Sequence, residues 1–199
     1  AKPQGTAEAL ATSEPGDMQA ARVFARLNEG RLSYVAQVGR WMLWDGIRWG
    51  WCGTGEEMQA AKRTADAVLD HCIKLVRQDA ERHKKRLAFA LRLQNLPRLE
   101  AMLRLAQSEP GMSVGTMTEL DADPWLLGVK NGVVDLKTGA FLAPDPKMLI
   151  TRQAGALYDR GAKCPRWLEF LHSIMEGDVD TIGFIRRALG YTLTGLTTE

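Results

Sequence analysis

The chain has 199 residues, of which 45% are hydrophobic and 25% are charged. This is the composition of a globular domain, and it excludes a collagen-like or largely disordered protein. The 26 basic and 24 acidic side chains give a formal net charge of +2, which taken alone argues against a surface covered with phosphate-binding cations. No run approaches the roughly 18 apolar residues of a membrane span, and the N-terminus lacks a secretory signal, so we expect a cytoplasmic protein with no membrane partner.

The three cysteines, Cys52, Cys72 and Cys164, are odd in number and widely spaced. They form no disulfide framework, which fits a reducing compartment. His71 and Cys72 are neighbours on an expected helix and point in different directions, and the chain has no CxxC motif. We therefore expect no metal site.

Residues 1–16 contain one large apolar side chain, Leu10, among Ala, Thr, Ser, Pro, Gly and Glu. Such a segment buries too little apolar surface to offset its ordering entropy, so we expect a disordered segment or linker. Asp17 is the expected N-cap of a short helix. Residues 17–199 are expected to form a single helix-rich domain.

A β-rich segment is expected over residues 32–51, which hold four of the six tryptophans. Asp45-Gly46 between two aromatic runs predicts a hairpin, because a type I′ turn needs positive φ at both central residues. The rings of Trp41, Trp44 and Trp49 have two interpretations. They are a weak candidate for base stacking, or they pack within a small sheet. The packing interpretation is favoured.

Three consecutive helices are expected in the middle of the chain. Thr54 and Glu57 have the spacing of a capping box and predict the start of the first helix. A break is expected near residues 78–82, and Asn95 with Pro97 predicts the start of the third helix.

The second half begins with β structure and ends in helices. Asn-Gly and Thr-Gly pairs separate apolar runs at residues 126–129, 133–136 and 140–142, which predicts a small meander. Apolar stripes over residues 167–175 and 182–189 predict two more helices. We therefore predict an α+β fold that is predominantly α-helical and contains two small antiparallel β elements.

The weak net charge conceals a basic middle. Residues 62–104 contain 11 basic and 5 acidic side chains, a net charge of +6, whereas the rest of the chain sums to −4. The densest basic run, residues 82–86 (RHKKR), is expected at a helix start, where it opposes the helix macrodipole. A phosphate-rich partner is one explanation for it and a solvated helix face is the other. The candidate DNA-binding residues are Arg77, Arg82, Lys84, Lys85, Arg86 and Arg92.

No catalytic site can be assembled from the sequence. Asp121 and Asp123 have the spacing of a two-metal carboxylate pair on a strand, but Pro124 favours a turn in which carboxylates cap backbone amides. The phosphate loop GxxxxGK[ST] does not occur, and neither does HExxH. We expect no catalytic residue and no cofactor within these residues.

Several sequence blocks occur in the order typical of one family. Residues 34–49 (YVAQVGRWMLWDGIRW) and 100–111 (EAMLRLAQSEPG) resemble the N-terminal-like domain of poxvirus, phage and plasmid primase-helicases. The blocks of the second half are more specific, and the resemblance covers about residues 17–199. These blocks are LDADPWLL (120–127), VKNGVVDLKTG (129–139), DP (145–146), LIT (149–151), CPRW (164–167) and LGYTLTG (189–195).

The resemblance implies a DNA replication domain that precedes a superfamily 3 helicase ATPase. On this basis we expect a fragment that ends before the motor, with any primase or polymerase site upstream. ATP and Mg²⁺ would serve the parent protein, an ATP-hydrolysing helicase. The implied partners are single-stranded or forked DNA, the helicase and primase domains of the same chain, and further copies in a homo-oligomer, which is a hexamer in the intact protein.

Two functions from different classes remain open. In the first, the domain binds DNA through its basic helices and positions it for a ring helicase. In the second, it is a protein–protein scaffold that links the primase part to the helicase ring without direct DNA contact. An enzyme within these residues is a third alternative, for which the sequence offers no site.

Overall fold

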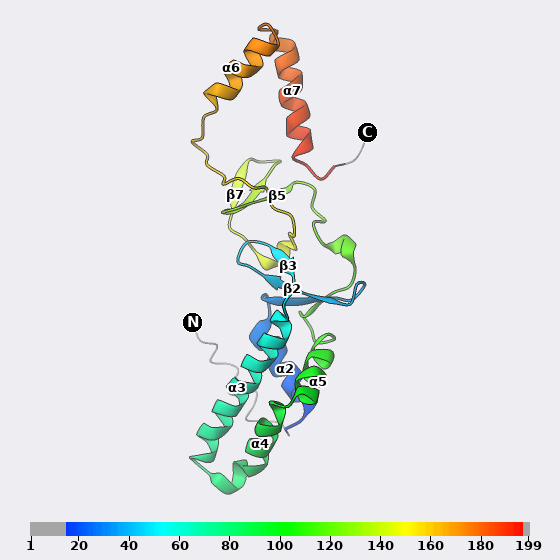
Figure 1. The fold of residues 1–199 in the computed structure, drawn as a ribbon, viewed down its shortest axis with the longest axis vertical. Coiled ribbons are helices and arrows are strands. Elements are labelled where there is room, and N and C mark those ends of the chain that lie inside the picture. The colour runs from blue at the N-terminus through cyan, green and yellow to red at the C-terminus, as the bar shows by residue number, and fades with distance from the viewer. Residues whose placement is uncertain (1–14, 197–199) are drawn as a thin grey trace. The chain divides into compact units, whose positions relative to one another are not determined.

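The computed structural model describes residues 15–196, so almost all of the segment predicted as a linker, residues 1–16, lies outside the described residues. Within these described residues, six α-helices and two small sheets confirm the predicted helix-rich α+β fold (Figure 1). The contacts between residues divide the chain into two compact units. Unit 1 is Ala1–Asp45 with Trp49–Glu119, and unit 2 is Gly46–Arg48 with Leu120–Glu199.

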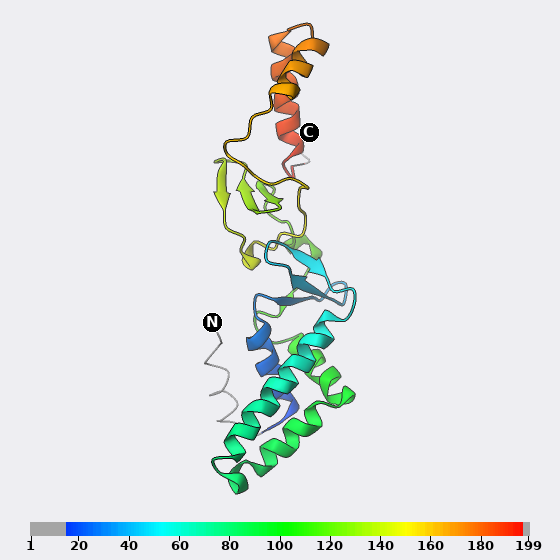
Figure 2. The ribbon, with the colours of Figure 1, turned by 60° about the vertical axis from the view of Figure 1, so that its left-hand side comes forward.

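Four helices pack together in unit 1. They are α2 (Asp17–Asn28), α3 (Glu56–Val76), α4 (Ala80–Leu93) and α5 (Leu96–Ala106). Figures 1 and 2 show α3 and α4 as an antiparallel hairpin, with α2 and α5 beside α3, and these pairs are in contact. The buried face of α3 consists of the small side chains Ala60, Ala61, Thr64 and Ala65 followed by Val68 and Cys72. Small side chains allow the neighbouring helices to approach α3 closely.

Two helix starts differ from the predicted ones by one or two residues. Helix α2 has Gly16 as its N-cap, so Asp17 is the first helical residue rather than the cap. Helix α3 has Gly55 as its N-cap, in the left-handed conformation with φ 84°. Its cap contacts come from Glu56, whose carboxylate accepts from the Gly53 and Thr54 amides. Glu56 competes successfully because it lies one residue closer to these amides than Glu57. The predicted start at Asn95 is confirmed.

The sheet of unit 1 has the strand order β3-β2-β1-β4. Its strands are β1 (Leu32–Val35), β2 (Arg40–Trp44), β3 (Trp49–Trp51) and β4 (Ser113–Val114). The predicted hairpin at Asp45-Gly46 is present between β2 and β3. Its connection runs over residues 45–48, longer than a two-residue turn. Strand β4 adds parallel to β1, a pairing between distant segments that no local turn signal predicts.

Unit 2 contains the predicted meander, in the antiparallel order β5-β6-β7. The side chains of Val129, Val133, Val134 and Ile150 are buried in this unit. No helix among the described residues is long and apolar enough to span a membrane.

The elements of unit 2 are β5 (Leu126–Val129), β6 (Gly132–Asp135), β7 (Ala140–Leu142), the 3-10 turn η2 (Pro146–Met148), α6 (Pro165–Ile174) and α7 (Val179–Thr192). The other 3-10 turn, η1 (Met117–Glu119), belongs to unit 1.

Gly132 provides a test of this meander. A Cβ at this position would lie 2.6 Å from Phe141 Cζ and 2.8 Å from the Leu142 carbonyl oxygen. Because such contacts force the sheet to shift, we expect Gly132→Ala to lower the stability of the meander by about 1–3 kcal/mol. Hydrogen exchange of the β5–β7 amides measures this. Gly50→Ala in β3, where a Cβ meets nothing within 4 Å, is the control, and equal exchange in both variants would contradict the packing described.

Candidate nucleic-acid interface

The predicted basic cluster lies on the α3–α4 hairpin, and the helical period divides it between two faces. Ala90 and Leu93 are buried, and His83, Arg86 and Leu87 are half-buried. These positions recur at spacings of three and four residues, so they form the side of α4 that packs on unit 1. Lys84, Lys85 and Arg92, at other positions of α4, are exposed.

Four of the six candidate cations are exposed. Arg77 follows the last residue of α3, Lys84 and Lys85 lie in the first half of α4, and Arg92 lies near the end of α4. The Arg92 Nε donates to the Ala88 carbonyl at 3.2 Å, which holds the guanidinium along its own helix. Arg82 also lies on α4. Solvent and a phosphate can reach Arg77, Lys84, Lys85 and Arg92.

Arg86 is different, because the structure places it on the packing side of α4. Its side chain is half-buried and lines a small cavity of about 20 Å³ with Val68, Cys72 and Phe89. A long side chain in this position covers apolar surface with its methylene groups. Arg86 therefore contributes to the packing of α4. Because Arg86 lies on the packing side, the basic run at residues 82–86 does not make one continuous basic surface.

His71 is half-buried in this hairpin, and its surroundings lower its pKa. Burial lowers its pKa first, and the cationic neighbours Lys74 and Arg86 lower it further, together with His83. Like charges and desolvation both disfavour the imidazolium form. The neutral form of His71 is therefore the one that the folded hairpin favours.

This depressed pKa makes unit 1 sensitive to acid. The unfolded chain binds a proton at His71 near the ordinary pKa of 6.5, whereas the folded chain binds it only at lower pH. Stability is therefore lost as the pH falls through 6.5. We expect the thermal midpoint to fall between pH 7.5 and 5.5, and His71→Gln to reduce this fall. Circular dichroism melts at both pH values measure it, and an identical fall in the variant would contradict the assignment.

Two tryptophans of the first sheet are buried, Trp41 and Trp49. Trp41 is 8% exposed, and its ring lies 6.1 Å from Phe24 and 5.3 Å from Tyr34, centroid to centroid. Trp49 is 4% exposed and lies 5.6 Å from the half-buried Trp44 ring. The buried rings of Trp41 and Trp49 have no free face for a base, so the packing interpretation accounts for them.

A group of metal-ligand residue types occurs at the start of α3. The ligand atoms of Cys52, Glu56 and Glu57 lie within 4.8 Å of one another. The Glu56 carboxylate accepts hydrogen bonds from the backbone and hydroxyl of Thr54, and backbone hydrogen bonds lower its pKa to about 2. Burial, and then the neighbouring carboxylates, raise the pKa of Cys52 to about 12. Within this group the Glu56 carboxylate caps the start of α3, because it accepts from the Gly53 and Thr54 amides at 3.0 Å.

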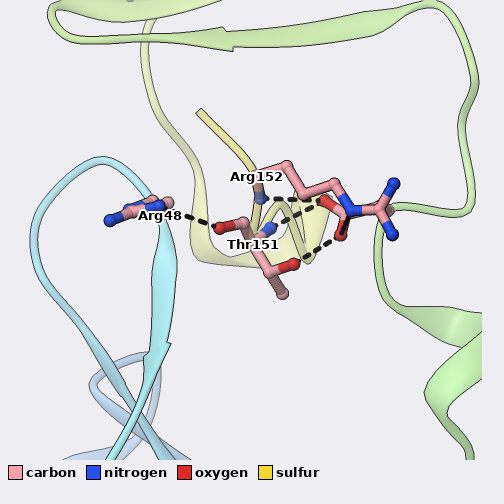
Figure 3. A network of polar contacts seen from close by, with 4 residues as sticks. Arg48, Thr151 and Arg152 are labelled. Atoms are coloured by element: carbon pink, nitrogen blue, oxygen red, sulfur yellow. Dashed lines mark hydrogen bonds and ion pairs between the residues drawn. The ribbon is translucent and has the colours of Figure 1, made fainter. Parts of the chain in front are cut away.

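Asp121 and Asp123 form turns, as the turn interpretation predicts. Asp121 has φ 50° and accepts from the Thr151 amide at 2.7 Å, from the Thr151 hydroxyl and from the Arg152 amide at 3.3 Å. Asp123 accepts from the Trp125 amide at 3.0 Å. Figure 3 shows the contacts of Thr151 and Arg152, where Arg48 donates to the Thr151 carbonyl at 3.3 Å. The carboxylates thus join two segments of unit 2.

Removing the Asp121 carboxylate tests this role. We expect Asp121→Ala to lower the free energy of unfolding of unit 2 by about 1–3 kcal/mol, because the Thr151 and Arg152 donors lose their acceptor. Asp121→Asn should cost less, since asparagine keeps one acceptor oxygen and tolerates positive φ. Denaturant titration followed by circular dichroism measures both variants. Equal stability of the alanine variant and the parent chain would contradict the assignment.

Sequence reasoning missed an aromatic pair in unit 2. Phe141 on β7 and Tyr158 stack with ring centroids 5.2 Å apart and planes 6° apart. The two residues are 17 positions apart, so no local periodicity connects them. A charge count would have directed attention there, since residues 136–166 contain six basic and two acidic side chains.

A comparison with protein-family models identifies the family of this chain. No curated protein matches the chain. The family model described as D5 N terminal like matches residues 21–176. This family is the N-terminal domain of D5-like primase-helicases of phages, plasmids and poxviruses. The match covers more than half of the chain, so this protein belongs to the D5 N-terminal-like family.

Proposed function

We propose that this domain binds DNA through the exposed cations of the α3–α4 hairpin and positions it for the ring helicase of a replicative primase-helicase. The observation that carries the proposal is the set of exposed side chains Arg77, Lys84, Lys85 and Arg92 on one helical hairpin. Exposed cations gain affinity for DNA by releasing condensed counterions, whatever the base sequence.

The replication role rests on the family. The N-terminal region of a D5-like primase-helicase is the setting in which a DNA-guiding domain is useful. In this proposal ATP and Mg²⁺ serve the motor of the parent protein, because the sequence of this chain has no GxxxxGK[ST] loop to hold them. A hexameric ring and the primase part of the same chain are proposed partners on the same basis.

Charge removal on α4 tests the DNA contact. We expect Lys84→Gln/Lys85→Gln to weaken binding of single-stranded DNA and to reduce the salt slope of log Kd by about 1.4, because each lost phosphate contact removes about 0.7. Fluorescence anisotropy at several salt concentrations, with single-stranded and forked DNA, provides the slope.

The matched control is Arg31→Gln/Arg104→Gln, which removes the same charge from exposed arginines of unit 1 outside the hairpin. Its slope should stay close to that of the parent chain. Arg86→Gln should lower the melting temperature and leave the salt slope almost unchanged, since Arg86 packs against α3. The proposal fails if the parent chain binds no DNA at micromolar protein in low salt, or if both double variants change the slope equally.

A protein–protein scaffold is the second candidate, and one observation favours it. Helices α6 and α7, with the turn that follows, carry nine exposed large apolar side chains. Exposed apolar surface of this kind is typical of protein contacts. A scaffold that needs no DNA would bind a helicase or primase domain while showing no salt-dependent DNA affinity. The residues are Trp167, Leu168, Phe170, Ile174, Val179, Phe184, Leu189, Tyr191 and Leu193.

A further inference from the structure

The edge of the second sheet holds a groove that the proposed function does not use. Its volume is about 750 Å³, and it is lined by Thr138, Gly139, Ala140, Phe141, Tyr158, Asp159 and Arg160. Phe141 is 45% exposed and Arg160 is exposed. The groove therefore lies open at the surface, with an aromatic pair and a guanidinium along it.

The aromatic pair is held in place by backbone contacts. Tyr158 exchanges two hydrogen bonds with Asn131: its amide donates to Asn131 Oδ1 at 2.8 Å, and its carbonyl accepts from Asn131 Nδ2 at 2.9 Å. The Tyr158 hydroxyl reaches the Gly139 carbonyl at 3.4 Å. Phe141 lies against Gly132, where no side chain intervenes. Fixed rings lose little conformational entropy when a ligand stacks on them.

The chemistry of the groove fits a base together with its phosphate. Aromatic side chains stack on any base, and an adjacent cation contacts the backbone. Arg160 supplies that cation, and the surrounding basic excess supplies a favourable field. Asp159 is the one carboxylate of the lining, and its Oδ1 already accepts from the Gly161 amide at 2.8 Å.

We infer that this groove binds a base of single-stranded DNA, stacked on the Phe141–Tyr158 pair with its phosphate at Arg160. The inference rests on the proposed DNA-binding function and adds a second contact site to it, in unit 2. A strand is favoured over a free nucleotide because most of the lining is exposed, so the groove does not enclose its ligand.

Base-dependent affinity tests the stacking directly. Anisotropy of the 199-residue chain is measured with labelled oligo-dT and with an oligonucleotide of equal length that carries abasic sites. The parent chain should bind oligo-dT roughly 5- to 100-fold more tightly, as expected for a stacked base. Phe141→Leu and Tyr158→Leu should each reduce that ratio with an unchanged salt slope, whereas Tyr158→Phe, which keeps the ring, should preserve it.

The controls separate stacking from folding and from charge. Trp167→Leu removes an exposed aromatic ring outside the groove lining and should leave the ratio unchanged. Arg160→Gln should lower the salt slope by about 0.7, the value for one phosphate contact on a single strand. Melts of each variant confirm that unit 2 remains folded.

Three results would overturn the inference. If folded Phe141→Leu and Tyr158→Leu chains keep the full preference for oligo-dT, the groove does not stack a base. The proposed function still stands in that case if the Lys84→Gln/Lys85→Gln variant has a reduced salt slope. If thymidine monophosphate competes as well as oligo-dT, the ligand is a free nucleotide. If the parent chain binds no DNA in low salt, the proposed function and the inference fail together.

Discussion

The packing of α4 against α3 is the constraint on which the rest of unit 1 depends. The small side chains of α3, such as Ala61 and Ala65, allow its neighbours to approach closely. On α4 the buried side chains are Ala90 and Leu93. This contact fixes the rotation of α4 about its own axis. The rotation in turn decides which cations face the solvent, since the side chains of a helix repeat every 3.6 residues. Lys84 and Lys85 are therefore available to a phosphate, whereas Arg86 covers apolar surface.

Unit 2 has a different balance between burial and exposure. Its meander buries a few valines, and carboxylates such as Asp121 close its loops through backbone amides. Helices α6 and α7 expose large apolar side chains, whereas the β7 edge exposes the Phe141 ring beside Arg160. The chain thus offers two kinds of surface in unit 2, an apolar one suited to protein and an aromatic, basic one suited to nucleic acid.

Local sequence patterns predicted the helices and strands well. Contacts between segments that are distant in the sequence could not be predicted from such patterns. The strands and helices follow from turn residues and apolar spacing, so the meander at residues 126–142 and the start at Asn95 were predicted. The parallel β1–β4 pair, the division into two units and the Phe141–Tyr158 stack join residues that are distant in the sequence. The site prediction counted charges along the chain, which could not separate Arg86 from Lys85. Aromatic density likewise indicated Trp41, which is buried.

The central claim is that DNA contacts the α3–α4 hairpin and the groove of unit 2. Photocrosslinking of the chain to single-stranded DNA that contains 4-thiothymidine, with the attachment sites mapped by mass spectrometry, tests it most directly. The account predicts crosslinked peptides from residues 77–92 and 137–160. Crosslinks confined to α6, α7 or the first sheet would contradict it, because DNA would then contact surfaces that this account assigns to protein or to the core.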